Sequence, residues 1–488
     1  MVLQRETNAS IWGWSEPNEK IEVTASWGKS VSIEADENGA WRGTIATPKA
    51  GGPYKLKIEG SSKLVFRNVM IGEVWFCSGQ SNMETPMKSY YKEDRIVSEA
   101  SSSKVRLFKT PRLCSEKENN DVKGEWTESD FENLKSFSAT GYFFGRHLEK
   151  ELNVPIGLIQ SAWGGRRIET FTPWETQKQM QYLVDERKDR EQKAKSWDQE
   201  KVNAEYKEKA DIWREKVEEW KNNESKGKKP RRPGKKLHPI NGGRYPSGNY
   251  NGMINPFLGY SMKGVIWYQG EANAKLKVTE EDNCPSNYDN MLERLVGSWR
   301  NRWKIGDFPF YWVQLPEFRS PVETPIQENC GWAEIRQSML DATFKIPNTG
   351  VAVAMGLGEA KNIHPHKKKE VGDRLALLAL KNDYGKKDIV WTGPLAKRCV
   401  FDGKKAIITF ENSGADLAFS GQAGEGFAVT TQSGETIKAE AKIVTSNQLE
   451  ISSDKEITAV YYAWAQNPAG ANLQNKAGLP ASPFRFLK

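Results

Sequence analysis

Hydrophobic and polar residues alternate over short stretches in the first 70 residues of the chain. Residues 20–27 and 54–58 show this pattern, and turn residues such as Asn38-Gly39 separate one stretch from the next. Alternation with a period of two is typical of a strand with one buried side and one solvent-facing side. We therefore predict a small antiparallel β domain over residues 1–70.

Beyond residue 71 the pattern changes to short, continuous apolar runs, separated by longer segments with helical periodicity. Five of these runs are predicted to be buried strands: 72–78, 156–161, 264–269, 309–315 and 350–355. Helical patterns cover four further segments: 139–151, 286–303, 333–344 and 367–382. Strands that alternate with helices predict a parallel sheet with helices on both faces, an α/β fold.

Two further regions depart from this alternation. Residues 177–222 are rich in Lys, Glu, Gln and Ala with aromatic residues at intervals, and predict a long helical hairpin anchored to the body by its Trp and Tyr side chains. Strand patterns resume after residue 391: 405–410, 426–430, 437–444, 448–452 and 456–462. We expect three domains: 1–70 (β), 71–390 (α/β, with the helical insert at about 177–238) and 391–488 (β).

Size and charge narrow the class of protein. A chain of 488 residues is too long for one ordinary core, which agrees with two or three domains. Much of the net charge of +8 lies in residues 226–236, and we interpret this stretch as a solvated basic loop rather than a nucleic-acid site. We expect no membrane partner, because the sequence has no apolar run of about 18 residues.

Cysteine and histidine are scarce, and their spacing indicates no metal site. No Cys-x-x-Cys motif occurs, and the cysteine spacing suits no zinc site. No cofactor is expected. Cys77 lies in an apolar run and is interpreted as a small buried residue. The other cysteines leave disulfide pairing open. The chain has four histidines: His147, His238, His364 and His366.

The run that ends near residue 78 leads into Ser78-Gly79-Gln80-Ser81-Asn82, a polar turn that contains glycine. In α/β enzymes, reactive groups lie beyond the carboxyl ends of parallel strands. Ser81 is therefore a candidate nucleophile, although serine beside glycine is also common in ordinary turns. The Gly-x-Ser-x-Gly elbow of the α/β-hydrolases is absent, so a different hydrolase fold is expected.

Three other strand ends carry groups that suit acyl transfer. Gly164-Gly165 follows the second strand, Gln269 ends the third, and His364 follows the fifth. A serine nucleophile needs a general base, and the N–H groups of Ser81, Gly165 and Gln269 are candidate donors to an oxyanion. Each of these residues alone is more often structural. Their common position at strand ends favours a single site.

These segments resemble the sialate O-acetylesterase family, a branch of the SGNH-type esterases. The resemblance rests on four blocks and covers nearly the whole chain: 72–84, 157–165, 264–271, and 363–365 with 371–376 behind it. It implies a three-layer α/β/α core flanked by β domains, and metal-free removal of acetyl groups from O-acetylated sugars. It also implies that Ser81 is the nucleophile, that His364 is the base, and that Ser81, Gly165 and Gln269 form the oxyanion hole.

One departure concerns the acid that orients the histidine. Relatives often carry Asp shortly before it, whereas this chain has Lys361-Asn362, and the nearest acid is Glu359. Three interpretations follow, in order of preference. Glu359 orients His364; a backbone carbonyl orients it, which makes a Ser-His dyad; or the site is weakened or dead.

A second departure is Arg166, where relatives often have a small hydroxyl residue. Its guanidinium can bind the carboxylate of an acidic sugar or form an ordinary ion pair. Trp163 and Asn251 are further candidate sugar contacts. The alternative function is a carbohydrate-binding pseudoenzyme, suggested by the missing Asp, the 18 Trp residues and the two flanking β domains.

The N-terminal residues have no apolar signal region, so the protein is cytosolic or a leader is missing from the sequence. Relatives of this architecture are often exported by bacteria that degrade glycans. The resemblance therefore implies a periplasmic or secreted location. The expected partner is an O-acetylated carbohydrate substrate, and the oligomeric state is left open.

Overall fold

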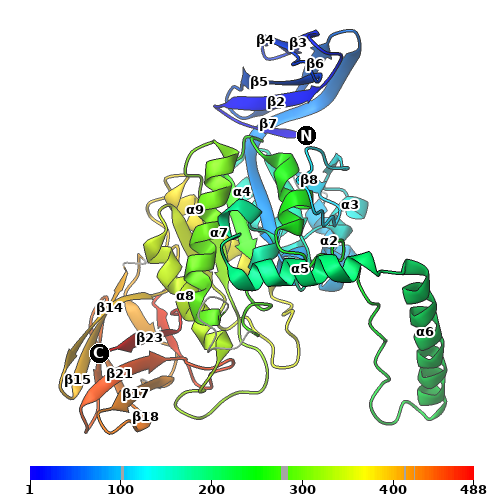
Figure 1. Ribbon diagram of the computed structural model, residues 1–488. Coiled ribbons are helices and arrows are strands. Elements are labelled where there is room, and N and C mark those ends of the chain that lie inside the picture. Colours follow the sequence, from blue (N-terminus) through cyan, green and yellow to red (C-terminus); the bar gives the residue numbers. More distant parts are fainter. Residues whose placement is uncertain (101–103, 276–283, 412–413, 423) are drawn as a thin grey trace. The chain divides into compact units, whose positions relative to one another are not determined.

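The computed structural model describes residues 1–100, 104–275, 284–411, 414–422 and 424–488 (Figure 1). The chain forms two compact units. One contains Met1–Pro111, Asp121–Ile168 and Phe257–Lys488, and the other contains Arg112–Asn120 and Glu169–Pro256. This division follows contacts in space rather than the three consecutive ranges expected from the sequence, and those ranges stay a prediction.

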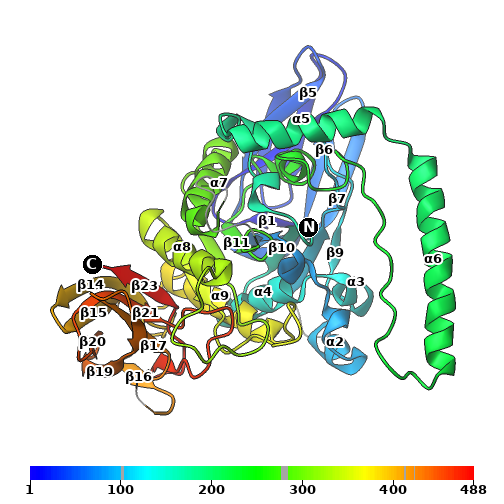
Figure 2. The same ribbon diagram turned by 60° about the horizontal axis from the view of Figure 1, so that its bottom comes forward.

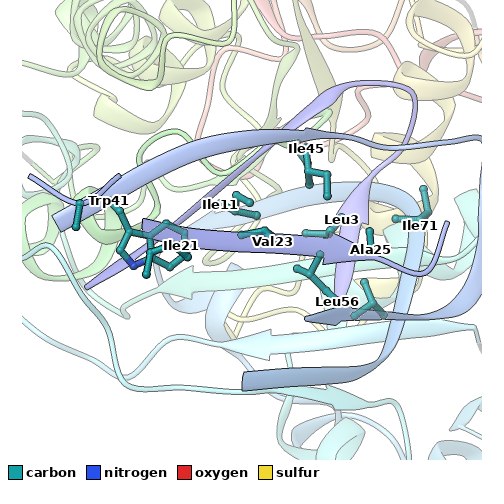
Figure 3. Close-up of a cluster of buried hydrophobic side chains, with 12 residues drawn as sticks. Leu3, Ile11, Ile21, Val23, Ala25, Trp41, Ile45, Leu56 and Ile71 are labelled. Carbon is teal, nitrogen blue, oxygen red and sulfur yellow. The ribbon is translucent and has the colours of Figure 1, made fainter. Parts of the chain in front are cut away.

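The N-terminal segment of the first unit is built from short β-strands: β1 (Val2–Gln4), β2 (Asn8–Trp14), β3 (Lys20–Ala25), β4 (Lys29–Glu34), β5 (Ala40–Ala46) and β6 (Gly51–Glu59). β3 pairs antiparallel with β4 and β6, and β2 pairs with β5. Side chains alternate between solvent and interior along β3, where Ile21, Val23 and Ala25 are buried. These side chains lie in one apolar cluster with Ile11, Trp41 and others (Figure 3).

The strand β7 (Lys63–Gly79) joins this segment to the central sheet. Its first half pairs with β6, and its second half lies between β10 (Ile156–Ala162) and β11 (Gly264–Tyr268). The central order is β13-β12-β11-β7-β10-β8-β9. The remaining strands are β8 (Val105–Lys109), β9 (Trp126–Glu128), β12 (Phe310–Gln314) and β13 (Thr349–Val353). All neighbours are parallel except β8 and β9, which confirms the predicted parallel sheet.

Helices cover both faces of this sheet. The larger ones are α4 (Ala139–Leu152), α7 (Tyr288–Trp303), α8 (Gly331–Lys345) and α9 (Lys368–Asn382). Successive residues of β7 point to opposite faces, because a strand has a period of two. Trp75 contacts the Phe144 ring of α4, whereas Phe76 contacts the rings of Trp299 and Trp303 in α7. Figure 2 shows β10 and β11 between α7 on one side and α4 with α9 on the other.

Short helices complete the first unit: α1 (Ser81–Glu84), α2 (Glu93–Ala100) and α3 (Phe131–Ser136). Its C-terminal part contains two four-stranded sheets, in the orders β14-β15-β20-β19 and β18-β17-β21-β23, and the pair β16-β22. The bounds are β14 (Leu395–Asp402), β15 (Lys405–Glu411), β16 (Leu417–Phe419), β17 (Phe427–Thr431), β18 (Thr436–Lys438), β19 (Glu440–Thr445), β20 (Gln448–Ser452), β21 (Ile457–Tyr462), β22 (Leu473–Asn475) and β23 (Phe484–Leu487). The predicted strand 437–444 is two strands.

The second unit contains α5 (Gln181–Lys195) and α6 (Gln199–Asn222), but these helices do not form the predicted hairpin. In Figures 1 and 2, α6 leads away from α5, and the basic loop returns beside it. Two tryptophan side chains of α6 bind this loop. The indole of Trp213 donates to the Pro230 carbonyl at 3.0 Å, and that of Trp220 donates to Gly227 at 3.2 Å. The expected anchoring to the body is therefore wrong for these two residues.

The described part of the chain contains no helix that is long and apolar enough to cross a membrane. All five cysteines are free thiols. Cys77 is fully buried on the α4 face of β7, and burial raises the pKa of its thiol well above the ordinary value. It is the small packing residue that the sequence predicts.

Candidate active site

The strand β7 ends in a tight turn that requires glycine. Gly79 has φ of +134°, and a Cβ on it would lie 2.2 Å from the carbonyl oxygen of Tyr268. The chain then enters α1, whose first residue is Ser81. The first N–H groups of a helix have no acceptor within the helix, so the Ser81 N–H is available to an external acceptor.

The structure brings Ser81 and His364 together. Ser81 Oγ lies 2.8 Å from His364 Nε2, although 283 positions separate the two residues in the chain. His364 lies in the loop between β13 and α9, and Asn362 holds its backbone. The Asn362 side chain accepts from the His364 N–H at 3.0 Å and donates to the His364 carbonyl at 2.6 Å.

The surroundings of His364 favour its neutral, proton-accepting form. Burial lowers the pKa of the imidazole below its ordinary value, and the positive charges of Lys368 and Lys275 lower it further. A histidine that is neutral near pH 7 can take a proton from a serine hydroxyl. The short contact to Ser81 Oγ gives that proton a direct path.

Glu359 does not contact the His364 ring. Its carboxylate accepts from the backbone N–H and from Nδ1 of His366, both at 2.7 Å, and from Asn362 Nδ2 at 3.3 Å. Burial opposes ionisation of Glu359, but the hydrogen bonds from His366 and Asn362 outweigh it and lower its pKa. Among the residues described, none forms a hydrogen bond with His364 Nδ1. Ser81 and His364 therefore form a pair in which Nδ1 is held neither by a carboxylate nor, as the second interpretation expected, by a backbone carbonyl of these residues.

The two glycines that follow β10 lie differently beside Ser81. A Cβ on Gly164 would be 3.2 Å from Ser81 Cβ, and the Gly164 N–H donates to the Glu84 carboxylate at 2.8 Å. Gly165 is exposed, has φ of +69° and has open space where a Cβ would be. Gly165 directly follows Gly164, which lies against Ser81. The Gly165 N–H therefore stays a candidate oxyanion donor.

Gln269 does not match its expected role. Its side chain is fully buried, and Nε2 lies within hydrogen-bond distance of three acceptors: Gln80 Oε1 (3.1 Å), the Arg166 carbonyl (3.0 Å) and Asn273 Oδ1 (2.8 Å). An amide has two N–H groups, so three protein acceptors leave none for an oxyanion. Gln269 instead ties together the turns that follow β7, β10 and β11.

The candidate sugar contacts lie in different places. Arg166 is buried, and its guanidinium stacks over the Trp163 ring at 4.5 Å. Asn251 belongs to the second unit, where its side-chain amide donates to the carbonyls of Ser115 and Glu116 at 3.0 and 2.9 Å. Both N–H groups of the Asn251 amide are therefore used within the protein, which argues against the expected sugar contact.

Three polar residues behind the nucleophile turn were missed by the sequence analysis. Asn82, Glu271 and Lys368 are buried and joined by hydrogen bonds through the Asn82 side chain. Asn82 and Glu271 lie inside two of the four blocks that carry the family resemblance, and their place there could have marked them as site residues. Lys368 carries no local signal, because lysine at the start of a helix is usually exposed.

A solved structure defines the class of protein. The crystal structure of a carbohydrate acetylesterase from Xanthomonas citri matches this chain with a TM-score of 0.79 and 31% sequence identity. The match covers 99% of this chain and 96% of the other. Together with the serine and histidine at the edge of a parallel sheet, this places the chain among the carbohydrate esterases with an α/β fold.

The family follows from the sequence. Residues 71–226 and 246–381 match the family described as carbohydrate esterase, sialic acid-specific acetylesterase. The sialate O-acetylesterase of Mus musculus is 28% identical over 533 residues, 99% of this chain and 92% of the mouse protein. The Homo sapiens protein of the same name is 27% identical over 530 residues, 99% and 90% of the two chains. The chain belongs to the sialic acid-specific acetylesterase family.

These findings confirm the resemblance, the fold class and the expected kind of enzyme, a carbohydrate O-acetylesterase. None of them favours the pseudoenzyme alternative. They do not test the roles of individual residues.

Proposed function

We propose that this protein hydrolyses O-acetyl esters of sugars with Ser81 as the nucleophile and His364 as the general base. The observation that carries the proposal is the 2.8 Å contact between Ser81 Oγ and His364 Nε2 at the carboxyl edge of the parallel sheet. The family match supports the ester and the sugar. The pairing of a hydroxyl with a neutral imidazole supports the mechanism.

In the first half of the reaction, Ser81 Oγ attacks the acetyl carbonyl carbon while His364 Nε2 takes the hydroxyl proton. The N–H groups of Ser81 and Gly165 donate to the oxyanion of the tetrahedral intermediate. The ester C–O bond then breaks, and His364 returns the proton to the departing sugar oxygen.

The second half of the reaction uses the same groups. A water molecule attacks the acetyl group on Ser81 and gives a proton to His364. The bond to Ser81 Oγ breaks, Ser81 regains its proton, and acetate leaves. Two N–H donors suffice for this scheme, so Gln269 holds the surrounding turns rather than the oxyanion.

The substrate we propose is an O-acetylated sugar of the sialic acid or hemicellulose type. The family match, which is described as sialic acid-specific, supports an acidic sugar. A glycan substrate of this kind supports a periplasmic or secreted location. Acetate release from acetylated sialosides compared with acetylated xylan distinguishes the two substrate types.

The test of the mechanism is turnover of a chromogenic acetyl ester. We expect Ser81→Ala to lose at least about a thousandfold in kcat, whereas Ser89→Ala, a change at an exposed serine of the same segment, keeps the wild-type rate. An organophosphonate ester should label wild type and S89A but not S81A. Full activity in S81A would refute the assignment, and sugar binding without turnover in wild type would support the pseudoenzyme.

A further inference from the structure

A pair of buried ionisable side chains lies directly behind the nucleophile turn. Lys368 opens α9 and is fully buried, and Glu271, just beyond β11, is 2% exposed. Asn82, the residue after the candidate nucleophile, lies between them at 1% exposure. Its Oδ1 accepts from Lys368 Nζ, and its Nδ2 donates to a Glu271 carboxylate oxygen.

The same amide also holds the histidine loop. Asn82 Nδ2 donates to the carbonyl of Ile363 at 3.1 Å, and Ile363 directly precedes His364. The backbone carbonyl of Asn82 accepts from Thr140 Oγ1 at 3.1 Å, which fixes Asn82 against α4. One side chain therefore connects the nucleophile turn, the histidine loop and the first residue of α9.

Stability does not explain this arrangement. Taking two charges out of water costs several kcal/mol for each ion, and replacement by apolar residues is often neutral or stabilising. The second carboxylate oxygen of Glu271 and the hydroxyl of Tyr268 are buried without a hydrogen-bond partner among the described residues. Costly buried charges beside reactive groups are typical of functional sites.

Charged groups from several elements surround His364 and Lys368. Lys368 from α9 and Lys275 from the segment after β11 act on His364, whose Nε2 contacts Ser81. Glu271 and Glu359 act on Lys368, and the rings of Tyr90 and Tyr268 lie 5.2 and 5.5 Å from its Nζ. Burial lowers the pKa of Lys368 to about 7, against the attraction of the two carboxylates.

We propose that Asn82, Lys368 and Glu271 are positioning residues that take the place of an acid on the His364 ring. Asn82 holds the His364 loop against the nucleophile turn, and the ammonium charge of Lys368 keeps the imidazole in its proton-accepting form. Glu271 keeps that ammonium charged inside the protein. The inference rests on the proposed use of Ser81 and His364.

The first test replaces Lys368 with Met, which keeps the length of the side chain and removes the charge. The positive charge lowers the pKa of His364, so its loss should raise that pKa. We expect an upward shift of about half a unit or more in an NMR titration, with the His364 signal identified by its absence in His364→Gln. The acid limb of kcat/KM should move to higher pH by the same amount.

The matched control is Lys369→Met, on the same helix. Lys369 is exposed and pairs with Asp373, so its loss should leave the His364 titration and kcat/KM unchanged. An unchanged His364 titration in K368M, or an equal shift in K369M, would overturn the electrostatic part of the proposal.

The second test concerns position. Asn82→Ala removes the link between the turn and the histidine loop, and we expect kcat to fall about tenfold or more while KM stays within about twofold. If N82A does not fold, Asn82→Ser serves the same purpose, because its shorter side chain cannot reach all three partners. A kcat within about twofold of wild type in a folded variant would overturn the positioning role.

The two proposals fail separately. Absence of acetyl ester turnover in wild type would refute the proposed function, while the His364 titration in K368M would still test the network. Turnover that depends on Ser81 but is insensitive to N82A and K368M would refute the network and leave the proposed function intact.

Discussion

Gly164 shows how closely the second strand end approaches the nucleophile. A Cβ at this position would lie 3.1 Å from Glu84 Oε2 and 3.2 Å from Ser81 Cβ. Its φ lies outside the left-handed region, so the backbone itself tolerates alanine. The constraint on Gly164 is therefore the space next to Ser81 rather than backbone conformation.

Gly164→Ala should displace Ser81 by a few tenths of an ångström and lengthen its contact with His364. Because reaction rates depend steeply on the placement of the attacking atom, we expect kcat to fall about tenfold. The melting temperature should change little, since Gly164 is only half-buried. An unchanged kcat in steady-state assays would show that the site accommodates the extra methyl group.

Glu359→Gln should have a small effect on catalysis, because the carboxylate lies on His366 and not on the His364 ring. Glutamine keeps an oxygen that can accept from the His366 N–H. We expect kcat to stay within about threefold of wild type in the chromogenic assay. A loss of more than about tenfold would mean that Glu359 moves onto the His364 ring during the reaction.

At the scale of elements, the close packing of α4 against α9 depends on a small residue. A Cβ on Gly372 of α9 would lie 2.7 Å from the backbone nitrogen of Phe144 and 2.9 Å from Phe143 Cβ. A backbone atom cannot move aside as the end of a side chain can. The two helices could not keep this spacing with a larger residue at position 372.

We predict that Gly372→Ala lowers the free energy of unfolding by about 1–3 kcal/mol through overpacking. Gly297→Ala in α7 is the matched control. It has no atom within 4 Å of its added Cβ, and we expect a gain of about 0.5–1 kcal/mol from helix propensity. Urea unfolding midpoints measure both changes, and a neutral G372A would contradict the tight helix contact.

The sequence predicted the elements that are apolar throughout. All five predicted strands of the central sheet exist, because a strand buried on both faces is a continuous apolar run. The first half of β7 was not singled out, since its apolar run over residues 64–66 is only three residues long and residues 63–68 are exposed. The strand β8 was missed for a related reason: Arg106 and Lys109 interrupt its apolar residues, so it has no continuous apolar run.

The site was predictable only in part. Ser81 and His364 follow apolar strands, so their common edge could be inferred. The hydrogen-bond partners could not be inferred. Glu359 is close in sequence to both His364 and His366, and only the loop conformation decides which of the two it contacts. The Asn82–Lys368 contact joins positions 286 residues apart, and no local pattern indicates it.

At the scale of the whole molecule, α6 and the basic loop form a separable part of the second unit. The helix buries few side chains, namely Val202, Ala210 and Val217. The two ends of this segment lie close together, since the rings of Trp197 and His238 are 5.4 Å apart. A short linker can therefore replace the segment between them.

We predict that replacing residues 199–236 by a short Gly-Ser linker leaves chromogenic ester turnover within about twofold of wild type. Ser81, His364 and their neighbours all belong to the first unit, which this deletion does not touch. The melting temperature should also be preserved. Turnover that fell tenfold would instead assign the insert a part in catalysis.

Because β7 is continuous, a shift in its strand register in the N-terminal segment would also displace the nucleophile. A slip of two residues keeps every side chain on its own face, yet it translates a strand by about 7 Å along its axis. Such a slip in β7 would carry Ser81 out of reach of His364. The pairings of β7 with its parallel neighbours β10 and β11 oppose such a slip from both sides. The position of the reactive serine is therefore fixed by two sets of strand pairings at once.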